Sequence, residues 1–143
     1  MLIQNPLNEY ALAYPLLECV HLGAMTLGVG AAMLVNFRLL GVVMPQKAAA
    51  ELWRGGMLWT LCGLTLAIVS GLFLFSIDPG AYSINQAFRF KIAALVLAIV
   101  FHFTLVRRAA LSAFSKAASL TVGGVSLGLW TLVPFGGIFI GFV

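Results

Sequence analysis

The sequence predicts an all-α integral membrane protein, an antiparallel four-helix bundle with both termini on the outer side of the membrane. Its 143 residues are 62% hydrophobic and only 8% charged, whereas soluble domains average roughly 45–50% apolar and about 25% charged residues. Four long apolar stretches follow one another, joined by short links with charged or turn-forming residues. A soluble fold could not bury this much apolar surface, so we expect a single transmembrane domain over residues 1–143.

The four helices are predicted at about residues 11–36, 55–76, 84–107 and 119–142. Each stretch meets the requirement of roughly 20 residues to cross a hydrocarbon layer of about 30 Å. The third is the least regular, because Arg89 and Lys91 fall in its first turns and have to snorkel or pair. The short links favour antiparallel neighbours.

Small residues repeat every four positions in three of these helices, which allows close backbone approach in lipid. The stripes are Ala24, Gly28 and Ala32 in the first helix, Gly63, Ala67 and Gly71 in the second, and the pairs Gly124 with Gly128 and Gly137 with Gly141 in the fourth. Packing within one bundle explains them. Contact with a second copy, as a homo-oligomer, or with other membrane protein subunits is the alternative.

The basic residues indicate the orientation of the bundle. Six of the eight Lys and Arg residues fall on one side, and Arg89 and Lys91 fall on the other. The positive-inside rule places the six in the cytoplasm and both termini outside. The cations form no patch with interleaved polar surface, so we expect the lipid bilayer and no nucleic acid as a partner. The six are Arg38, Lys47, Arg54, Arg107, Arg108 and Lys116.

An acid and an imidazole lie one turn apart in the first helix, at Glu18 and His21. Ionisable groups at membrane depth are costly and usually face a bundle interior, a cavity or a cofactor. An ion pair of Glu18 with Arg89 or Lys91 across a helix interface would offset part of that cost. The pair leaves His21 available as a ligand, because an acid can orient an imidazole without binding the metal itself.

His21 is therefore the predicted cofactor and metal ligand, with Met25 and His102 as further candidates. His102 lies five residues before Arg107, whereas His21 lies 17 residues before Arg38, so the two imidazoles should differ in depth by roughly 15 Å or more. This difference disfavours one haem held by both. A haem b on His21 stays open, with its second axial ligand absent or supplied by another copy, and His102 could serve a second haem.

Other chemistries receive less support. Copper is the other metal candidate at His21, since Cys19, Met25 and Met33 add soft donors, although Cys19 and His21 point to different helix faces. A di-iron centre needs a second Glu-x-x-His arm, and no nucleophile elbow, P-loop or dinucleotide fingerprint is present. We expect a non-catalytic membrane subunit that binds haem or another redox group and serves electron transfer. The alternatives are a structural or accessory subunit of a larger complex and a copper or proton transport protein.

Three segments and two glycines carry a family resemblance. The run from Leu17 to Gly23, followed by Gly28, Gly30 and the segment from Asn36 to Gly41, together with the segment from Asn85 to Lys91, resembles a family of small, uncharacterised bacterial four-helix membrane proteins. The resemblance implies the fold and a bacterial inner (cytoplasmic) membrane location, with periplasmic termini. An aspartate commonly stands in that family where this chain has Asn36. A helix-one histidine followed by glycines is also similar, more distantly, to copper-resistance proteins of the D type and small membrane cytochromes.

Overall fold

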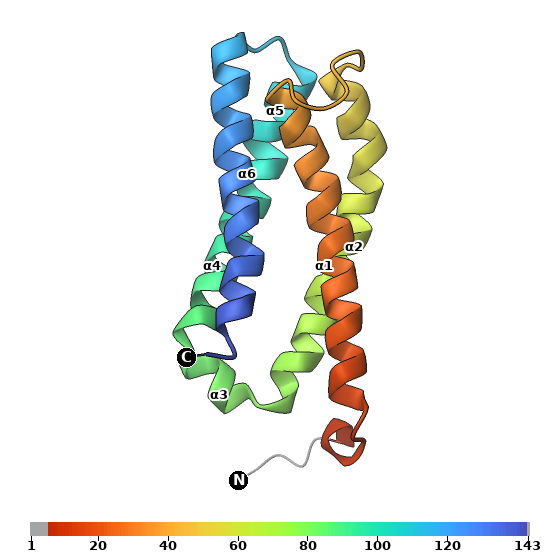
Figure 1. The fold of residues 1–143 in the computed structure, drawn as a ribbon, viewed down its shortest axis with the longest axis vertical. Helices are drawn as coiled ribbons and strands as arrows, with labels where there is room; N and C mark the ends of the chain where they lie inside the picture. Colours follow the sequence, from red (N-terminus) through yellow and green to blue (C-terminus); the bar gives the residue numbers. More distant parts are fainter. Residues whose placement is uncertain (1–5, 143) are drawn as a thin grey trace.

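The computed structural model describes residues 6–142, except the side chain of Asn8, and it is all-α (Figure 1). Four long helical segments are apolar enough to cross a membrane. A short helix precedes the first of them, and another links the second to the third. The elements are η1 (Pro6–Glu9), α1 (Ala13–Leu39), α2 (Ala49–Ile77), α3 (Pro79–Ile84), α4 (Gln86–Phe101), η2 (His102–Val106), α5 (Arg107–Leu111) and α6 (Lys116–Phe139). The chain is thus a multi-pass membrane protein with four candidate spans.

The predicted antiparallel bundle is confirmed. α1 packs along α2, α4 packs along α6, and α1 joins the two pairs by its contact with α6. Both ends of the described chain lie at the same end of the bundle, shown at the bottom of Figure 1 and called here the terminal end. The opposite end carries the connections from α1 to α2 and from α5 to α6, and is called here the loop end. The third span is continuous over Gln86–Leu111 but contains the π-helical turn η2, which the sequence did not predict.

Helix ends follow local sequence signals. α1 ends in a Schellman motif, in which Gly41 takes a φ of +75° and its N–H bonds the Arg38 carbonyl while the N–H of Val42 bonds the Phe37 carbonyl. α2 begins at Ala49, earlier than the predicted position 55. Hydropathy marks only the apolar part of a helix, whereas Ala49, Ala50 and Glu51 are good helix formers outside that part.

Close packing of α1 on α2 centres on two glycines of the predicted stripes. A Cβ atom on Gly28 would lie 2.7 Å from the backbone nitrogen of Leu64, and one on Gly63 would collide with the Gly28 backbone. In α6 the tightly packed glycines are Gly123 and Gly136, whereas a Cβ on Gly124 would meet nothing within 4 Å. The α6 stripe predicted from Gly124 and Gly128 therefore faces away from the described chain.

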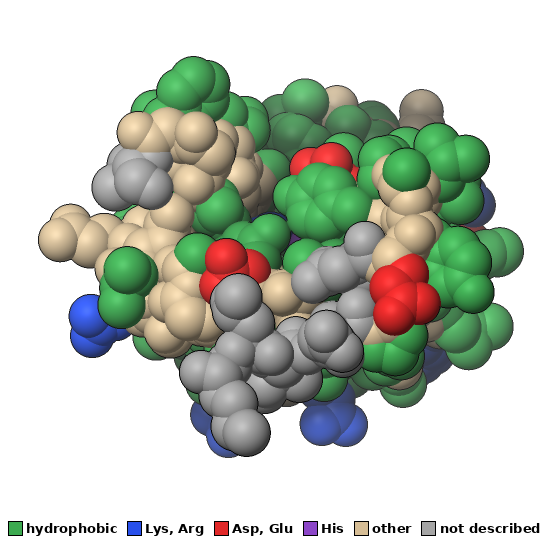
Figure 2. Space-filling view, turned by 90° about the horizontal axis from the view of Figure 1, so that it is seen from below, with side chains coloured by type: hydrophobic (Ala, Val, Ile, Leu, Met, Phe, Trp, Pro, Cys, Tyr) green, Lys and Arg blue, Asp and Glu red, His purple; other side chains and the backbone are tan. Residues whose placement is uncertain are grey.

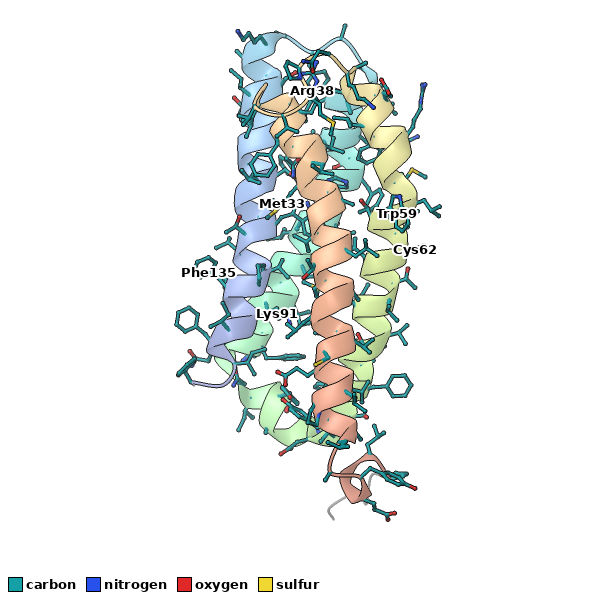
Figure 3. The ribbon with its side chains drawn as sticks, turned by 45° about the vertical axis from the view of Figure 1, so that its right-hand side comes forward. Met33, Arg38, Trp59, Cys62, Lys91 and Phe135 are labelled. Carbon is teal, nitrogen blue, oxygen red and sulfur yellow. The ribbon has the colours of Figure 1, made fainter. Side chains whose placement is uncertain are left out.

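The outer surface of the bundle is apolar, as lipid contact requires. Large side chains such as Trp59, at 57% exposure, and Phe135, at 54%, project outward (Figure 3). Because Cys19 and Cys62 lie in separate apolar stretches, the sequence predicts small buried hydrophobes and not a redox pair. Both cysteines are free and exposed, so the predicted burial is wrong. Cysteine is nearly as apolar as the lipid-facing residues around it, and sequence periodicity did not distinguish the two faces.

Candidate functional site

His21 lies where three helices meet. It is eight residues into α1, about 12 Å along the helix axis, and its side chain is half-buried. Its Nδ1 atom lies 2.9 Å from the carbonyl oxygen of Ala67 and 3.1 Å from Oγ of Ser70, both on α2. A carbonyl only accepts hydrogen bonds, so these partners assign the ring proton to Nδ1 and leave the lone pair on Nε2.

Lys91 reaches the other ring nitrogen from α4. Its Nζ atom lies 3.3 Å from His21 Nε2, where the ammonium donates and the imidazole accepts. Its stem lies against α6, where a Cβ on Gly136 would come within 3.0 Å of Lys91 Cβ and one on Gly137 within 3.3 Å of Nζ. Lys91 thus lies between the two helix pairs, in the half of the bundle nearer the terminal end (Figure 3).

Gly71 completes the surroundings of the imidazole. A Cβ there would lie 3.0 Å from Cε1 of His21, tighter than ordinary contact. The predicted small-residue stripe of α2 therefore provides space for the ring as well as backbone contact. We call this group the His21 site and define it as His21, Ser70, Gly71 and Lys91 with the Ala67 carbonyl.

Polar groups also lie at the terminal end of the bundle. Burial, a hydrogen bond with Tyr14, and the charges of Glu18 and Asp78 raise the pKa of Tyr82 to about 12. The ring of Tyr82 also packs on Phe88 at 5.5 Å between centroids. Acidic side chains gather on this end of the molecule (Figure 2). The His21 site therefore lies farther into the bundle than the polar groups of the terminal end.

The predicted ion pair of Glu18 stays a prediction. Glu18 is exposed, and Lys91 is directed at His21. Within the described residues, the ion pair closer than 4 Å is Lys47 with Glu51, at 3.3 Å, and it lies at the loop end. Arg89, the other predicted partner, is exposed as well.

Met25 lies deeper in the bundle than His21. It is buried in an apolar cluster that includes Val29, Leu64, Ala98 and Trp130. This cluster lies between the His21 site and the surroundings of His102. The arrangement gives Met25 a packing role and separates the two polar regions by apolar side chains.

His102, the first residue of η2, is 2% exposed and enclosed by aromatic rings. Its ring centroid lies 4.9 Å from that of Trp53, 5.3 Å from that of Phe103 and 5.8 Å from that of Trp130. Several buried polar atoms have no hydrogen-bond partner among the described residues. They are His102 Nδ1, Trp130 Nε1, Ser126 Oγ and both amide atoms of Asn36.

The two histidines lie at different depths, as predicted. The His21 ring lies against Gly71 and the His102 ring against Trp53. These two α2 residues are separated by 18 positions, or about 27 Å along the helix axis. One chain therefore does not bring both imidazoles to one haem iron.

Comparisons with known proteins leave the family open. No family model, curated protein or solved structure matches this chain. The four long apolar helices are those of a small four-helix membrane protein, the architecture that the resemblance implies. Within residues 6–142, no group of three or more His, Cys, Asp or Glu residues is placed to hold a metal ion.

Sequence reasoning identified His21 but missed its partners on α2. Ser70 and the Ala67 carbonyl fix the ring, and Gly71 makes room for it. A signal was present, because Ser70 is a polar residue beside a glycine within the second apolar stretch. Sequence reasoning also assigned Lys91 to Glu18, because an acid is the usual partner of a buried lysine.

Proposed function

We propose that this protein is a non-catalytic membrane subunit that binds a redox group at His21 and serves electron transfer, with haem b as the first ligand to test. The observation that carries the proposal is the hydrogen bond from His21 Nδ1 to the Ala67 carbonyl, at 2.9 Å. Histidines that bind metals usually donate the other ring N–H to a carbonyl or carboxylate, which fixes the tautomer and the ring orientation.

The donor chemistry of the site would suit haem iron, because an imidazole nitrogen is a common haem ligand. Nε2 carries the lone pair, and Lys91 Nζ is the atom in front of it. The lysine side chain is flexible, and glycines at positions 71, 136 and 137 keep β-carbons away from the ring and the lysine. When bound, the haem would supply one-electron redox chemistry. His21 would hold it once Lys91 Nζ, 3.3 Å from Nε2, had moved aside.

The apolar cluster next to the site supports a binding protein over a proton transporter. A proton path would have to pass Met25, Val29 and their neighbours, which are buried and carry no ionisable group. The His21 site instead lies nearest to the polar terminal end.

The location proposed for the protein is the bacterial inner membrane with periplasmic termini. The loop end carries Arg38, Lys47 and Arg54, among others, while Arg89 and Lys91 lie toward the terminal end. The positive-inside rule then supports a cytoplasmic loop end. Under this topology, the His21 site takes its ligand from the periplasmic side.

The direct test is a haemin titration of purified protein in mild detergent. Wild type should give a saturable Soret band with one haem per binding site, and His21→Ala should abolish the saturable component. Lys91→Met should keep or increase binding, because it opens Nε2 without removing the ligand. A wild-type protein without a saturable band, or a His21→Ala variant that binds as well as wild type, would contradict the proposal.

A structural subunit is the second candidate, and one observation favours it. Both ring nitrogens of His21 have partners, on α2 and on α4, so the residue can act simply as a bridge between helix pairs. Under this alternative, native purification recovers a stoichiometric partner subunit and haemin does not bind. The Lys91→Met variant separates the two functions, because it weakens a structural bridge but frees a haem ligand.

A further inference from the structure

A lateral groove runs between α2 and the last turns of the third span, at the loop end. Its volume is about 450 Å³. The buried side chain of Trp53 closes its back. One wall is formed by Arg54, Met57 and Leu61, and the other by Phe103, Arg107 and Leu111. Residues three or four apart in a helix share a face, so each wall is a continuous stripe along one membrane span.

The groove is basic near the membrane surface and apolar farther in. Arg54 lies five residues into α2 and Arg107 four residues before the end of α5, so both lie within about 8 Å of the helix ends. Leu61 lies seven residues deeper than Arg54 and Phe103 four residues deeper than Arg107. These residues continue the groove by about 10 Å and about 6 Å toward the middle of the membrane.

The two arginines are available to a ligand. Within residues 6–142, neither guanidinium group has a hydrogen bond or an ion pair. Arg38 at the same end is different, because its guanidinium donates to the backbone carbonyls of Lys47 and Pro45. A smaller adjoining hollow of about 320 Å³ shares Arg107 and adds Arg108. Positive charge therefore concentrates at one opening of an apolar groove.

The geometry points to a binding site for an anionic phospholipid in this groove, with the phosphate between Arg54 and Arg107 and an acyl chain along Met57, Leu61 and Phe103. Guanidinium groups bind phosphate oxygens in bidentate fashion, and basic pockets at the cytoplasmic ends of membrane helices suit acidic headgroups. The apolar walls open sideways, since Met57 is 44% and Leu61 41% exposed. A lipid reaches such a groove directly from the bilayer.

Net charge distinguishes the lipid classes. Phosphatidylcholine carries the same phosphate as phosphatidylglycerol, but its own cation compensates the charge. With no carboxylate among the groove residues, we expect the groove to prefer the anionic lipid. This site is independent of the redox function proposed for His21.

The test is lipid binding by delipidated protein in mild detergent, measured by native mass spectrometry with phosphatidylglycerol and phosphatidylcholine. Wild type should bind phosphatidylglycerol more tightly. Each basic residue near the surface contributes about 1 kcal/mol to binding acidic lipid, so the double variant Arg54→Gln with Arg107→Gln should lose affinity about 30-fold. Lys116→Gln removes a charge at the same end outside the groove and should leave the affinity unchanged.

Three results would overturn the site. Wild type binding both lipids equally would remove the anionic preference. An equal loss in Lys116→Gln would assign the effect to overall charge. Inorganic phosphate competing as strongly as the lipid would show that the apolar walls contribute nothing. Helicity and a monodisperse elution profile check that each variant is folded, and Arg54→Lys with Arg107→Lys should recover part of the affinity.

Discussion

The two histidines of this chain show two ways of placing an imidazole inside a membrane bundle. His21 is half-buried, and both of its ring nitrogens have partners, on α2 and on α4. His102 is almost fully buried, surrounded by aromatic rings, and its Nδ1 has no partner among the described residues. Burial alone would rank His102 as the more important residue, whereas hydrogen bonding ranks His21 first.

The surroundings of His21 fix the orientation of its ring, whereas those of His102 fix only the space that its ring fills. Hydrogen bonds fix which nitrogen of His21 carries the proton and where the lone pair points, which is what a ligand position needs. The aromatic neighbours of His102 fix only the volume of its ring. The sharpest consequence is that the same substitution should have different effects at the two positions.

The largest effect is expected from truncating the more buried ring. His102→Ala removes a ring packed on Trp53 and Trp130 and should destabilise the protein by about 3 kcal/mol, because a cavity remains. His102→Phe keeps a ring and should cost less than about 1.5 kcal/mol. Equilibrium unfolding in mixed detergent and SDS micelles measures both. Equal losses in the two variants would show that the imidazole nitrogens of His102 are needed.

A smaller loss of stability is expected when His21 is replaced by another ring. His21→Phe keeps a ring but leaves Lys91 without its partner, so we expect a loss of about 1–2 kcal/mol, more than for His102→Phe. A double-mutant cycle of His21→Phe with Lys91→Met should show a coupling of about 0.6 kcal/mol or more. Additive losses in the same unfolding assay would mean that the contact between His21 and Lys91 contributes nothing to the free energy of unfolding.

A smaller effect is expected from the space beside the His21 ring. Gly71→Ala places a Cβ 3.0 Å from Cε1 of His21 and should cost about 1 kcal/mol through displacement of the ring. Gly55→Ala is the matched control in the same helix, since a Cβ there meets nothing within 4 Å. Alanine is the better helix former, so Gly55→Ala should be neutral or stabilising. Gly71→Ala should melt at a lower temperature than Gly55→Ala. The reverse order would contradict a role of Gly71 in making room for the His21 ring.

The smallest effect is a pH dependence of the unfolding free energy, which arises from Tyr82 at the terminal end. Folding raises the pKa of Tyr82 from 10.0 to about 12, so the folded state favours the neutral phenol. The resulting stability is fully present below pH 10 and is lost as the pH rises toward 12. Unfolding curves over this window should show a slope that Tyr82→Phe reduces, and absorbance of the phenolate checks the titration. An unchanged slope in Tyr82→Phe would assign the effect to other groups.

The fold was predictable because lipid makes hydropathy a direct signal of burial in the membrane. The contact of Gly28 with Gly63 was also predictable, since small residues at a four-residue repeat mark a packing face. The rotation of α6 was not, because Gly123 and Gly124 differ by about 100° around the helix and either could have faced inward. Only the structure shows that Gly123 does.

The candidate site was predictable in part. His21 was identified because an imidazole at membrane depth is rare and costly. Its pairing with Lys91 depends on how far α4 lies from α1, a distance that sequence spacing does not encode. The aromatic enclosure of His102 was missed for the same reason, since Trp53 and Trp130 come from two other helices.

The most direct test of the redox-site proposal is a reduced-minus-oxidised absorption spectrum of protein purified from cells supplied with haem. Wild type, His21→Phe and His102→Phe are compared at equal protein concentration, so that both variants lose an imidazole and keep a ring. We predict a b-type spectrum in wild type and in His102→Phe, and its loss in His21→Phe. A wild-type protein without the spectrum, or a His21→Phe variant that retains it, would contradict haem binding at His21.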